Sequence, residues 1–141
     1  MKRPKNPFGW LLPLVLALAG CGSVPSSVGS GTVISVVCSL SYDSKKDTAI
    51  DQNWNFAPSE RQIVLGVTLR GYSPGSRCQI VRYLNGKYLD HGTVPIRKLA
   101  TSTIFYLWRL AKPGMSHLPG PYQVKVFVNG RFTKQIAYTV G

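Results

Sequence analysis

The amino-acid sequence predicts an all-β fold, a single antiparallel β-sandwich of about seven strands over residues 32–141. From residue 33 onward apolar and polar residues alternate, and this period of two is typical of half-buried strands. Asn-Gly pairs at 85–86 and 129–130 separate apolar runs, which is the strongest short-range signal for a hairpin. No segment longer than a turn has the 3.6-residue periodicity of a helix.

The N-terminal segment is expected to be an export signal. Lys2, Arg3 and Lys5 precede the apolar run 10-WLLPLVLALA-19, which is too short to span a hydrocarbon core of roughly 20 apolar residues. A basic start, a short apolar stretch and small residues at its end are typical of a secretory signal. Residues 1–20 are therefore interpreted as a signal peptide that is removed from the mature protein.

The last four residues of this region, Leu18-Ala19-Gly20-Cys21, resemble the lipobox of bacterial lipoproteins. The resemblance implies that the Cys21 sulfur accepts a diacylglycerol and that Cys21 becomes the first mature residue. Such an anchor would hold the protein at the cell membrane or the outer membrane, with the domain facing the periplasm or the exterior. The alternative is an ordinary secretory signal with a cysteine there by chance. Residues 21–31 are otherwise Gly, Ser, Pro, Val, a composition typical of a flexible tether.

The strands are expected in the following order. Ile34, Val36, Cys38, Leu40 and Tyr42 should share one face of the first strand. The next segments with strand character are 62-QIVLGVTLR-70, 77-RCQIVRYL-84, 87-KYLDHG-92 and 102-STIFYLWRL-110. Residues 43–61 are polar and rich in turn formers, and are interpreted as a long connection. Residues 95–100 are expected to form a helical turn or a short edge strand.

The last predicted hairpin, 121-PYQVKVFVNGRFTKQIAYTV-140, has Asn129-Gly130 at its turn. Its inward rows are expected to be Tyr122, Val124, Val126 and Val128 on the first arm and Phe132, Ile136, Tyr138 and Val140 on the second. Lys134 interrupts the second row, which predicts a strand edge or a bulge there.

The ending 118-LPGPYQVKVFVNG-130, followed by an alternating strand, resembles the last two strands of bacterial immunoglobulin-like or fibronectin-III-like domains. The resemblance covers roughly residues 60–140 and implies an immunoglobulin-like sandwich. It places Tyr122 where these sandwiches carry a corner tyrosine. Val124 stands where antibody domains have their second cysteine, so the antibody-type disulfide is absent. The resemblance carries no catalytic residues across.

Cys38 and Cys78 are the two cysteines that remain after Cys21. Export would place them in an oxidising compartment, where a disulfide between them is expected. The alternative is two small buried thiols that never meet. No metal site is expected, because two cysteines and the distant His91 and His117 lack the spacing of ligands. No cofactor is expected either.

The charge of the chain favours anionic partners. Without residues 1–20, fourteen Lys and Arg against five Asp and Glu give a net charge of +9. The basic residues are scattered with no run longer than two, so they do not specify one ligand. In an envelope the available anions are lipid headgroups, polymer phosphates and glycan carboxylates. Nucleic acid is not expected as a partner there.

The candidate binding residues are Trp54 and Phe56 on the long connection, and Arg82, Tyr83, Lys87 and Tyr88 around the first Asn-Gly turn. Aromatic residues on loops suit recognition of sugars or peptides. The alternatives are that Trp54 and Phe56 plug an open end of the sandwich and that the hairpin residues are ordinary sheet surface.

These observations favour a membrane-anchored envelope lipoprotein that acts as a non-catalytic structural, assembly or protein-interaction module. No enzyme is expected, because no catalytic constellation stands out. A hydrolase would require His91 or His117 in a pocket beside a carboxylate. The alternative function is a binding module for an anionic envelope polymer or lipid headgroup. Its partners would be the membrane, through the lipid anchor, and another envelope protein or an anionic envelope polymer.

Overall fold

The computed structural model describes residues 31–141, which form one compact unit. The expectations about Cys21, the signal peptide and nearly all of the tether fall outside the described residues. Within the described part all secondary structure is β: β1 Thr32–Asp43, β2 Thr48–Gln52, β3 Asn55–Phe56, β4 Gln62–Arg70, β5 Arg77–Leu84, β6 Lys87–Pro95, β7 Ser102–Arg109, β8 Gly120–Val128 and β9 Arg131–Val140. Residues 31–141 include no helix of the length and apolar character needed to cross a membrane.

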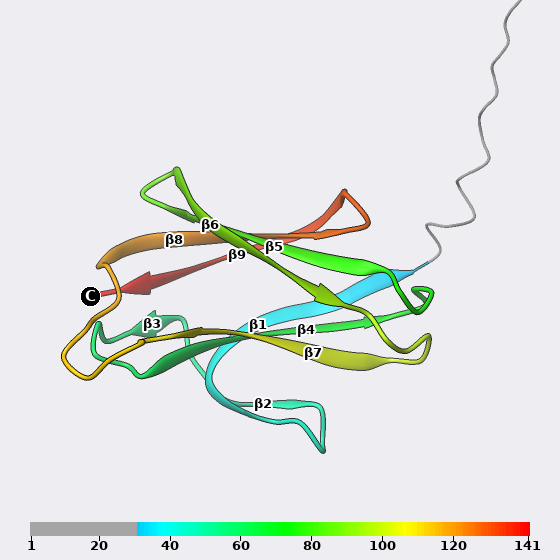
Figure 1. The fold of residues 1–141 in the computed structure, drawn as a ribbon, viewed down its shortest axis with the longest axis horizontal. Helices are drawn as coiled ribbons and strands as arrows, with labels where there is room; N and C mark the ends of the chain where they lie inside the picture. The colour runs from blue at the N-terminus through cyan, green and yellow to red at the C-terminus, as the bar shows by residue number, and fades with distance from the viewer. Residues whose placement is uncertain (1–30) are drawn as a thin grey trace, which may run out of the picture. The chain divides into compact units, whose positions relative to one another are not determined.

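Two sheets face each other in the described chain (Figure 1). One has the strand order β2-β1-β4-β7 and the other β3-β9-β8-β5-β6. All neighbouring strands are antiparallel except β3 and β9, which pair in parallel over two residues. The predicted all-β antiparallel sandwich is confirmed, with nine strands in residues 31–141 in place of about seven.

The two additional strands come from the segment that the sequence analysis interpreted as a connection. β2 folds back on β1 through a turn in which Asp47 has a φ of 50°. β3 is only two residues long. These strands were not predicted because β2 is mostly exposed and β3 is too short to show alternation.

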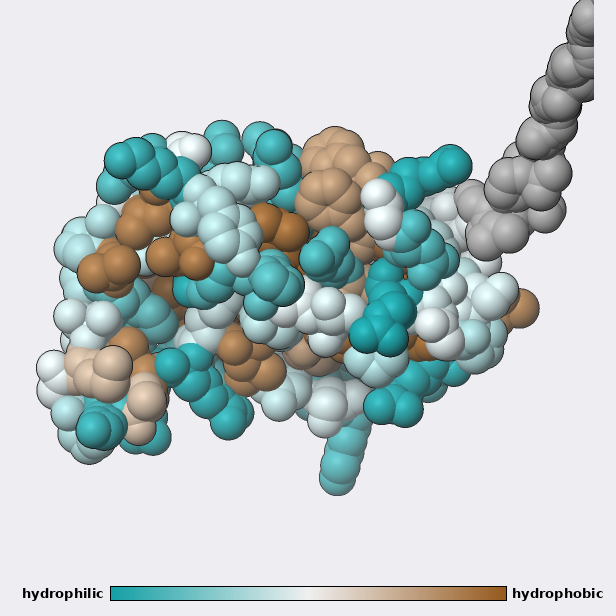
Figure 2. Space-filling model, turned by 45° about the horizontal axis from the view of Figure 1, so that its top comes forward, coloured by the Kyte–Doolittle hydropathy of each residue, from teal (hydrophilic) through white to brown (hydrophobic). Residues whose placement is uncertain are grey.

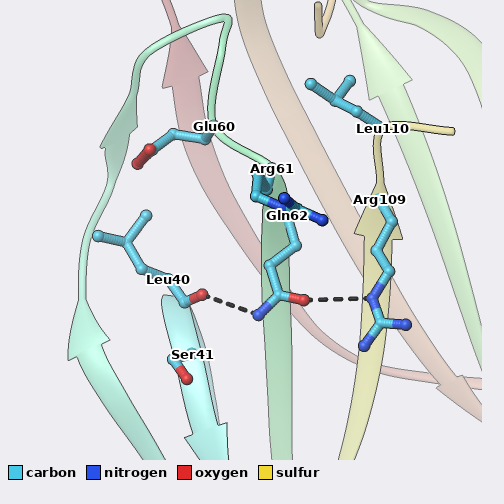
Figure 3. A pocket seen from close by; sticks show the side chains of 7 residues that line it. All are labelled: Leu40, Ser41, Glu60, Arg61, Gln62, Arg109 and Leu110. Atoms are coloured by element: carbon cyan, nitrogen blue, oxygen red, sulfur yellow. Dashed lines mark hydrogen bonds between the residues drawn. The ribbon is translucent and has the colours of Figure 1, made fainter. Parts of the chain in front are cut away.

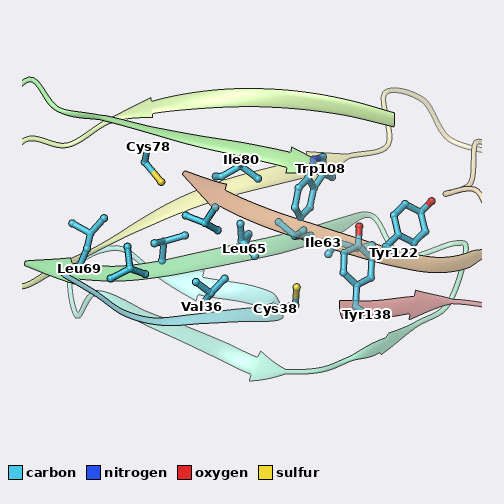
Figure 4. Packing of buried hydrophobic residues seen from close by; sticks show 14 of the residues in the cluster. Val36, Cys38, Ile63, Leu65, Leu69, Cys78, Ile80, Trp108, Tyr122 and Tyr138 are labelled. Atoms are coloured by element: carbon cyan, nitrogen blue, oxygen red, sulfur yellow. The ribbon is translucent and has the colours of Figure 1, made fainter. Parts of the chain in front are cut away.

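Alternating residues of the two sheets form the core, as predicted (Figure 4). On β4 the inward residues Ile63, Leu65, Val67 and Leu69 are fully buried. On β8 the inward row of Tyr122, Val124, Val126 and Val128 is buried as well. These rows interdigitate between the sheets and exclude water from the interior, which is the main favourable contribution to folding.

Both predicted Asn-Gly turns are present. Asn85 and Gly86 have φ values of 52° and 78°, and Asn129 and Gly130 have 51° and 81°. Two successive residues with positive φ give the turn whose twist matches antiparallel strands. Asn129 also accepts a hydrogen bond from the Arg77 backbone N–H at 3.0 Å, so this turn is tied to the start of β5.

Three predicted inward residues do not face the core. Ile34 is 42 % exposed because the register shifts between Val33 and Ser35. Tyr42 packs against the ring of Phe105. On that strand the adjacent residue Ile104 contacts the core, so Phe105 points to the opposite face of the sheet. Phe132 is 52 % exposed, since the pairing of β8 with β9 shifts beside Lys134. An extra residue in one strand exchanges the inward and outward faces for the residues beyond it. The bulge predicted at Lys134 is confirmed.

Tyr122 is the corner tyrosine that the resemblance implied. Its hydroxyl donates a hydrogen bond of 2.6 Å to the Leu118 carbonyl, four residues earlier. The Tyr122 ring stacks on the Tyr138 ring with centroids 4.7 Å apart. The hydrogen bond and the stacking together fix the entry into the last hairpin.

Candidate functional site

Arg82 is inside the sandwich, although it was predicted as a candidate binding residue near the hairpin tip. It lies on the inward row of β5 with Cys78 and Ile80, and is 9 % exposed. Two of its nitrogens donate hydrogen bonds of 3.0 and 2.6 Å to the Asp90 carboxylate. A third donates to the Tyr138 hydroxyl at 3.1 Å. Its polar groups are therefore used within the fold.

Aromatic rings surround the same guanidinium. The Arg82 Cζ atom lies 4.5 Å from the centroid of the Trp108 ring and 5.3 Å from that of Tyr122. Burial lowers the pKa of Arg82, but the hydrogen bonds to Asp90 and Tyr138 and the Asp90 charge outweigh it, and the net shift is upward. Burial also raises the pKa of Tyr138, against the opposing effect of Arg82. This cluster is a structural element that joins the two sheets.

The other predicted hairpin residues are on the surface of β5 and β6. Tyr88 is 59 % exposed, and its hydroxyl lies 2.6 Å from Nδ1 of His91. The Tyr83 and Tyr88 rings meet edge to face at 6.3 Å, and Lys125 lies over the Tyr83 ring. Lys87 is exposed at the turn. These residues form an aromatic and basic patch. Figure 2 shows one face of the molecule, on which apolar areas are separated by polar ones.

Trp54 and Phe56 have different surroundings. Phe56 is 1 % exposed and meets the Tyr138 ring edge to face at 5.6 Å, so it plugs the sandwich. Trp54 is 40 % exposed, while its backbone carbonyl accepts a hydrogen bond from the Thr139 N–H at 2.8 Å. The structure therefore makes Phe56 part of the core and leaves only the Trp54 side chain accessible.

The predicted Cys38–Cys78 disulfide is wrong for this structure, in which both thiols are free. Cys38 projects from β1 in one sheet and Cys78 from β5 in the other. Figure 4 shows Cys78 toward the Leu69 end of the core and Cys38 toward its Tyr138 end. A disulfide requires Cα atoms within about 7 Å. Burial raises the pKa of each thiol to about 12, so both remain protonated.

A cleft of about 530 Å³ lies at one end of the β1-β4-β7 sheet (Figure 3). We call it the end cleft; its lining residues are Leu40, Ser41, Glu60, Arg61, Gln62, Arg109 and Leu110. A neighbouring hollow of about 410 Å³ shares Arg61 and Leu110 with it and adds Lys112. Three cations therefore border this end of the sandwich, with Glu60 as the one carboxylate in the lining.

Hydrogen bonds hold one of these cations in place. Gln62 and Arg109 are directly opposed on β4 and β7. The Gln62 side-chain amide donates to the Leu40 carbonyl at 3.1 Å, and its oxygen accepts from Arg109 Nε at 3.2 Å (Figure 3). These two hydrogen bonds anchor the Arg109 guanidinium to the backbone of β1. The two terminal nitrogens of Arg109 remain available for an anion, which a guanidinium can bind through two parallel hydrogen bonds.

Arg82 is the only cation in residues 31–141 that forms an ion pair with a carboxylate. The thirteen other Lys and Arg residues of this part, including Arg61 and Arg109, have no such partner within 4.0 Å. Unpaired positive charge of this kind attracts anions. The end cleft differs from the rest of that surface because it combines concavity with a positioned guanidinium.

The histidines do not form a catalytic pair with a carboxylate in the described chain. Nε2 of His117 lies 2.9 Å from the backbone carbonyl of Glu60, and the His117 N–H donates to the Pro58 carbonyl. His91 contacts the Tyr88 hydroxyl. Across residues 31–141 no three His, Cys, Asp or Glu side chains approach one another closely enough to hold a metal ion.

No local sequence pattern marks Arg61, Gln62 or Arg109 as site residues. Arg61 and Gln62 are adjacent in the sequence, but Gln62 and Arg109 are 47 residues apart, and only the pairing of β4 with β7 brings Arg109 to them. The available signal was that Gln62 and Arg109 stand near the ends of predicted strands and that Arg61 directly precedes one.

No protein-family model matches the sequence, and no curated protein is similar to it. Among the solved structures that are similar to this chain, two illustrate the shared fold. An immunoglobulin-like protein from Pseudomonas aeruginosa aligns with a TM-score of 0.55 and 12 % identity, over 82 % of this chain and 100 % of its own. The alkylpurine DNA glycosylase AlkC of Pseudomonas fluorescens, bound to DNA with an abasic site analogue, aligns with a TM-score of 0.50 and 12 % identity. That alignment covers 79 % of this chain and 30 % of the glycosylase.

At 12 % sequence identity, these structural similarities show the fold and nothing more. Residues 31–141 form an immunoglobulin-like β-sandwich. The chain spans less than a third of the length of the glycosylase that it matches.

Proposed function

We propose that this protein is a lipid-anchored lipoprotein of the bacterial envelope whose immunoglobulin-like domain is non-catalytic and binds an anionic envelope component. The sequence Leu18-Ala19-Gly20-Cys21 supports the anchor, and the small residues after Cys21 support a tether to the domain. Acyl chains contribute about 0.8 kcal/mol per buried CH₂, so a diacylglycerol anchor would be long-lived.

The observation that carries the binding proposal is the positioned, unpaired guanidinium of Arg109 in the end cleft. Gln62 fixes its Nε, and Arg61 adds a second positive charge to the lining. Phosphate and carboxylate groups are the anions that match a guanidinium fork. The ligand class is therefore a phosphate-bearing headgroup or polymer, or a glycan carboxylate.

The anchor is tested by the intact mass of the native protein extracted from envelopes. We expect a mass for residues 21–141 plus a diacylglycerol, with or without a third acyl chain, and loss of that addition in a Cys21→Ser variant. A native chain without lipid would contradict the anchored protein, whether it starts before or after Cys21.

Binding is tested with the mature chain carrying Cys21→Ser, so that acyl chains cannot bring it to lipid. The probes are phosphatidylcholine vesicles with and without phosphatidylglycerol, and soluble polygalacturonate, which distinguish phosphate from carboxylate sources. We expect Arg61→Gln and Arg109→Gln each to weaken binding to the preferred anion about tenfold, since a hydrogen bond to a charged group contributes about 1.5 kcal/mol or more.

The matched control is Arg131→Gln, which removes the same charge from the β8–β9 hairpin. It should change the affinity less than about twofold, because exposed charges act through a screened field. If Arg131→Gln weakens binding as much as the cleft variants, the protein binds anions through its net charge and the end cleft is not the site. If neither probe binds, the anionic function is wrong.

A second candidate function is assembly with a protein partner. It is favoured by a separate observation, the open edge of β7, which pairs with β4 on one side only.

A further inference from the structure

β7 is an unprotected sheet edge in the described chain. It is the outermost strand of its sheet and pairs with β4 on one side only (Figure 1). The pairing is regular over all eight residues, from Ser102 to Arg109. On the far side of such a strand, alternate N–H and C=O groups lack strand partners and form a template for another strand.

The other sheet edges in residues 31–141 have features that discourage strand addition. β2 has five residues and β3 has two, so they leave part of β1 and most of β9 uncovered. Both uncovered parts have a register irregularity, and β9 also carries Arg131 and Lys134. β6 has a register irregularity opposite Arg82 and Tyr83, and it contains Asp90, Gly92 and Pro95. Short length, bulges, charge and proline are the means by which proteins protect an edge. β7 has none of these except the terminal Arg109, and its residues 103–107 are half-buried, with four large apolar or aromatic side chains.

A groove of about 290 Å³ follows the first half of this edge. We call it the edge groove; it is lined by Asp47, Val94, Pro95, Arg97, Lys98, Ser102, Thr103, Ile104 and Phe105. Val94, Pro95, Ile104 and Phe105 provide apolar surface. Arg97 and Lys98 are exposed, and no carboxylate lies within 4.0 Å of either among the described residues.

We propose that β7 accepts an extended, acidic segment of a partner protein as an additional strand. The backbone of the segment pairs with the open edge of β7. An apolar side chain of the segment fills the edge groove, and its carboxylates lie beside Arg97 and Lys98. In this mode of recognition main-chain hydrogen bonds give affinity and pockets for alternate side chains give specificity.

The positive charge of this protein favours an acidic partner over a second copy of the same chain. An antiparallel β7–β7 pair would place Arg109 of one copy opposite Ser102 of the other, next to the edge groove with its Arg97 and Lys98. Both copies also carry a net charge of +9 over the described residues. Like charges in such positions oppose pairing, whereas an acidic segment is attracted.

The test uses the mature chain and a synthetic peptide of alternating valine and glutamate, about ten residues long so that it can follow an eight-residue strand. Two matched peptides accompany it: one with lysine in place of glutamate, and one N-methylated at alternate residues. The readout is hydrogen exchange of the β7 amides. We expect the acidic peptide to protect them and both matched peptides to fail.

A charge exchange tests the groove directly. Arg97→Glu with Lys98→Glu should weaken the acidic peptide about tenfold or more and allow the lysine peptide to protect β7. Lys125→Glu and Arg131→Gln, both on strands of the other sheet, should leave the acidic peptide unaffected. The charge exchange at Arg97 and Lys98 leaves Arg61 and Arg109 in place, so it tests this inference separately from the proposed anion site.

Three results would overturn the inference. The first is no protection of β7 up to millimolar acidic peptide. The second is protection that survives N-methylation, which would exclude strand addition. The third is protection of β7 without peptide that increases with protein concentration, which would make a second copy the occupant.

Discussion

The guanidinium of Arg82 lies 4.5 Å from the centre of the Trp108 ring, across the gap between the two sheets. Arg82 comes from β5 and Trp108 from β7, so the contact joins one sheet to the other. In antibody domains a tryptophan packs against the inter-sheet disulfide. Here the two cysteines are unbonded, and an arginine with a carboxylate partner occupies the interior beside the tryptophan.

Removal of Arg82 should destabilise the domain strongly. In an Arg82→Ala variant the Tyr138 hydroxyl loses its donor and Trp108 loses a packed cation. We expect a loss of about 2–4 kcal/mol in the free energy of unfolding, measured by urea titration. Asp90→Asn should cost less, since the Asp90 side chain is 43 % exposed and water can replace part of the pair. Equal losses of unfolding free energy for the two variants would contradict a stabilising contact between Arg82 and the Trp108 ring.

Gly92 is expected to be intolerant of a side chain for a different reason. A Cβ added there would overlap the Tyr106 ring and hydroxyl, so the close approach of β6 to β7 requires glycine. Gly92→Ala should cost about 1–3 kcal/mol in unfolding free energy, as in overpacked cores. The control is Gly66→Ala, whose Cβ would lie 3.3 Å from a Phe105 ring carbon and should cost less. Adding Tyr106→Ala should reduce the penalty of Gly92→Ala; an unchanged penalty would exclude this contact as its cause.

The sequence predicted the architecture because the relevant signals are local. Alternation assigned the inward rows of β4 and β8, and each Asn-Gly pair assigned a turn. The failures also have local causes. The bulge near Ile34 and the one near Lys134 each insert a residue, and a single insertion exchanges the faces of a strand.

The surroundings of Arg82 and the lining of the end cleft were less predictable, because they depend on which residues of neighbouring strands lie opposite each other. The nearby Asn-Gly turn suggests a surface position for Arg82, whereas its place two residues after Ile80 on an alternating strand indicates an inward one, which the structure has. Nothing local indicated Asp90 as its partner. Similarly, Gln62 and Arg109 become opposed only when β4 pairs with β7.

The free thiols give a chemical prediction. Without reductant, the native protein should not react with iodoacetamide at Cys38 or Cys78, because both are buried and the pKa of each is raised to about 12 by burial. In denaturant without reductant both should be alkylated, as mapped by peptide mass spectrometry. Labelling of the unfolded chain only after reduction would show that the native protein carries the disulfide that is absent from this structure.

Alkaline pH should destabilise the domain. Burial raises the pKa of Cys38 and Cys78 from 9.0 to about 12, and it also raises the pKa of Tyr122 and Tyr138. The folded state therefore retains protons that the unfolded state releases. This contribution to stability is complete below pH 9 and is lost as the pH rises toward 12.

The measurement is the free energy of unfolding from urea titrations at pH 7, 9, 10 and 11 in the presence of reductant. Each such group can contribute a slope of up to about 1.4 kcal/mol per pH unit within its window. Cys38→Val removes one titrating group from the core and should flatten the decline above pH 9 relative to the parent. Lys87→Gln at the exposed turn should leave the slope unchanged. A stability that is constant from pH 7 to 11 in the parent would contradict the burial of these four groups as protonated species.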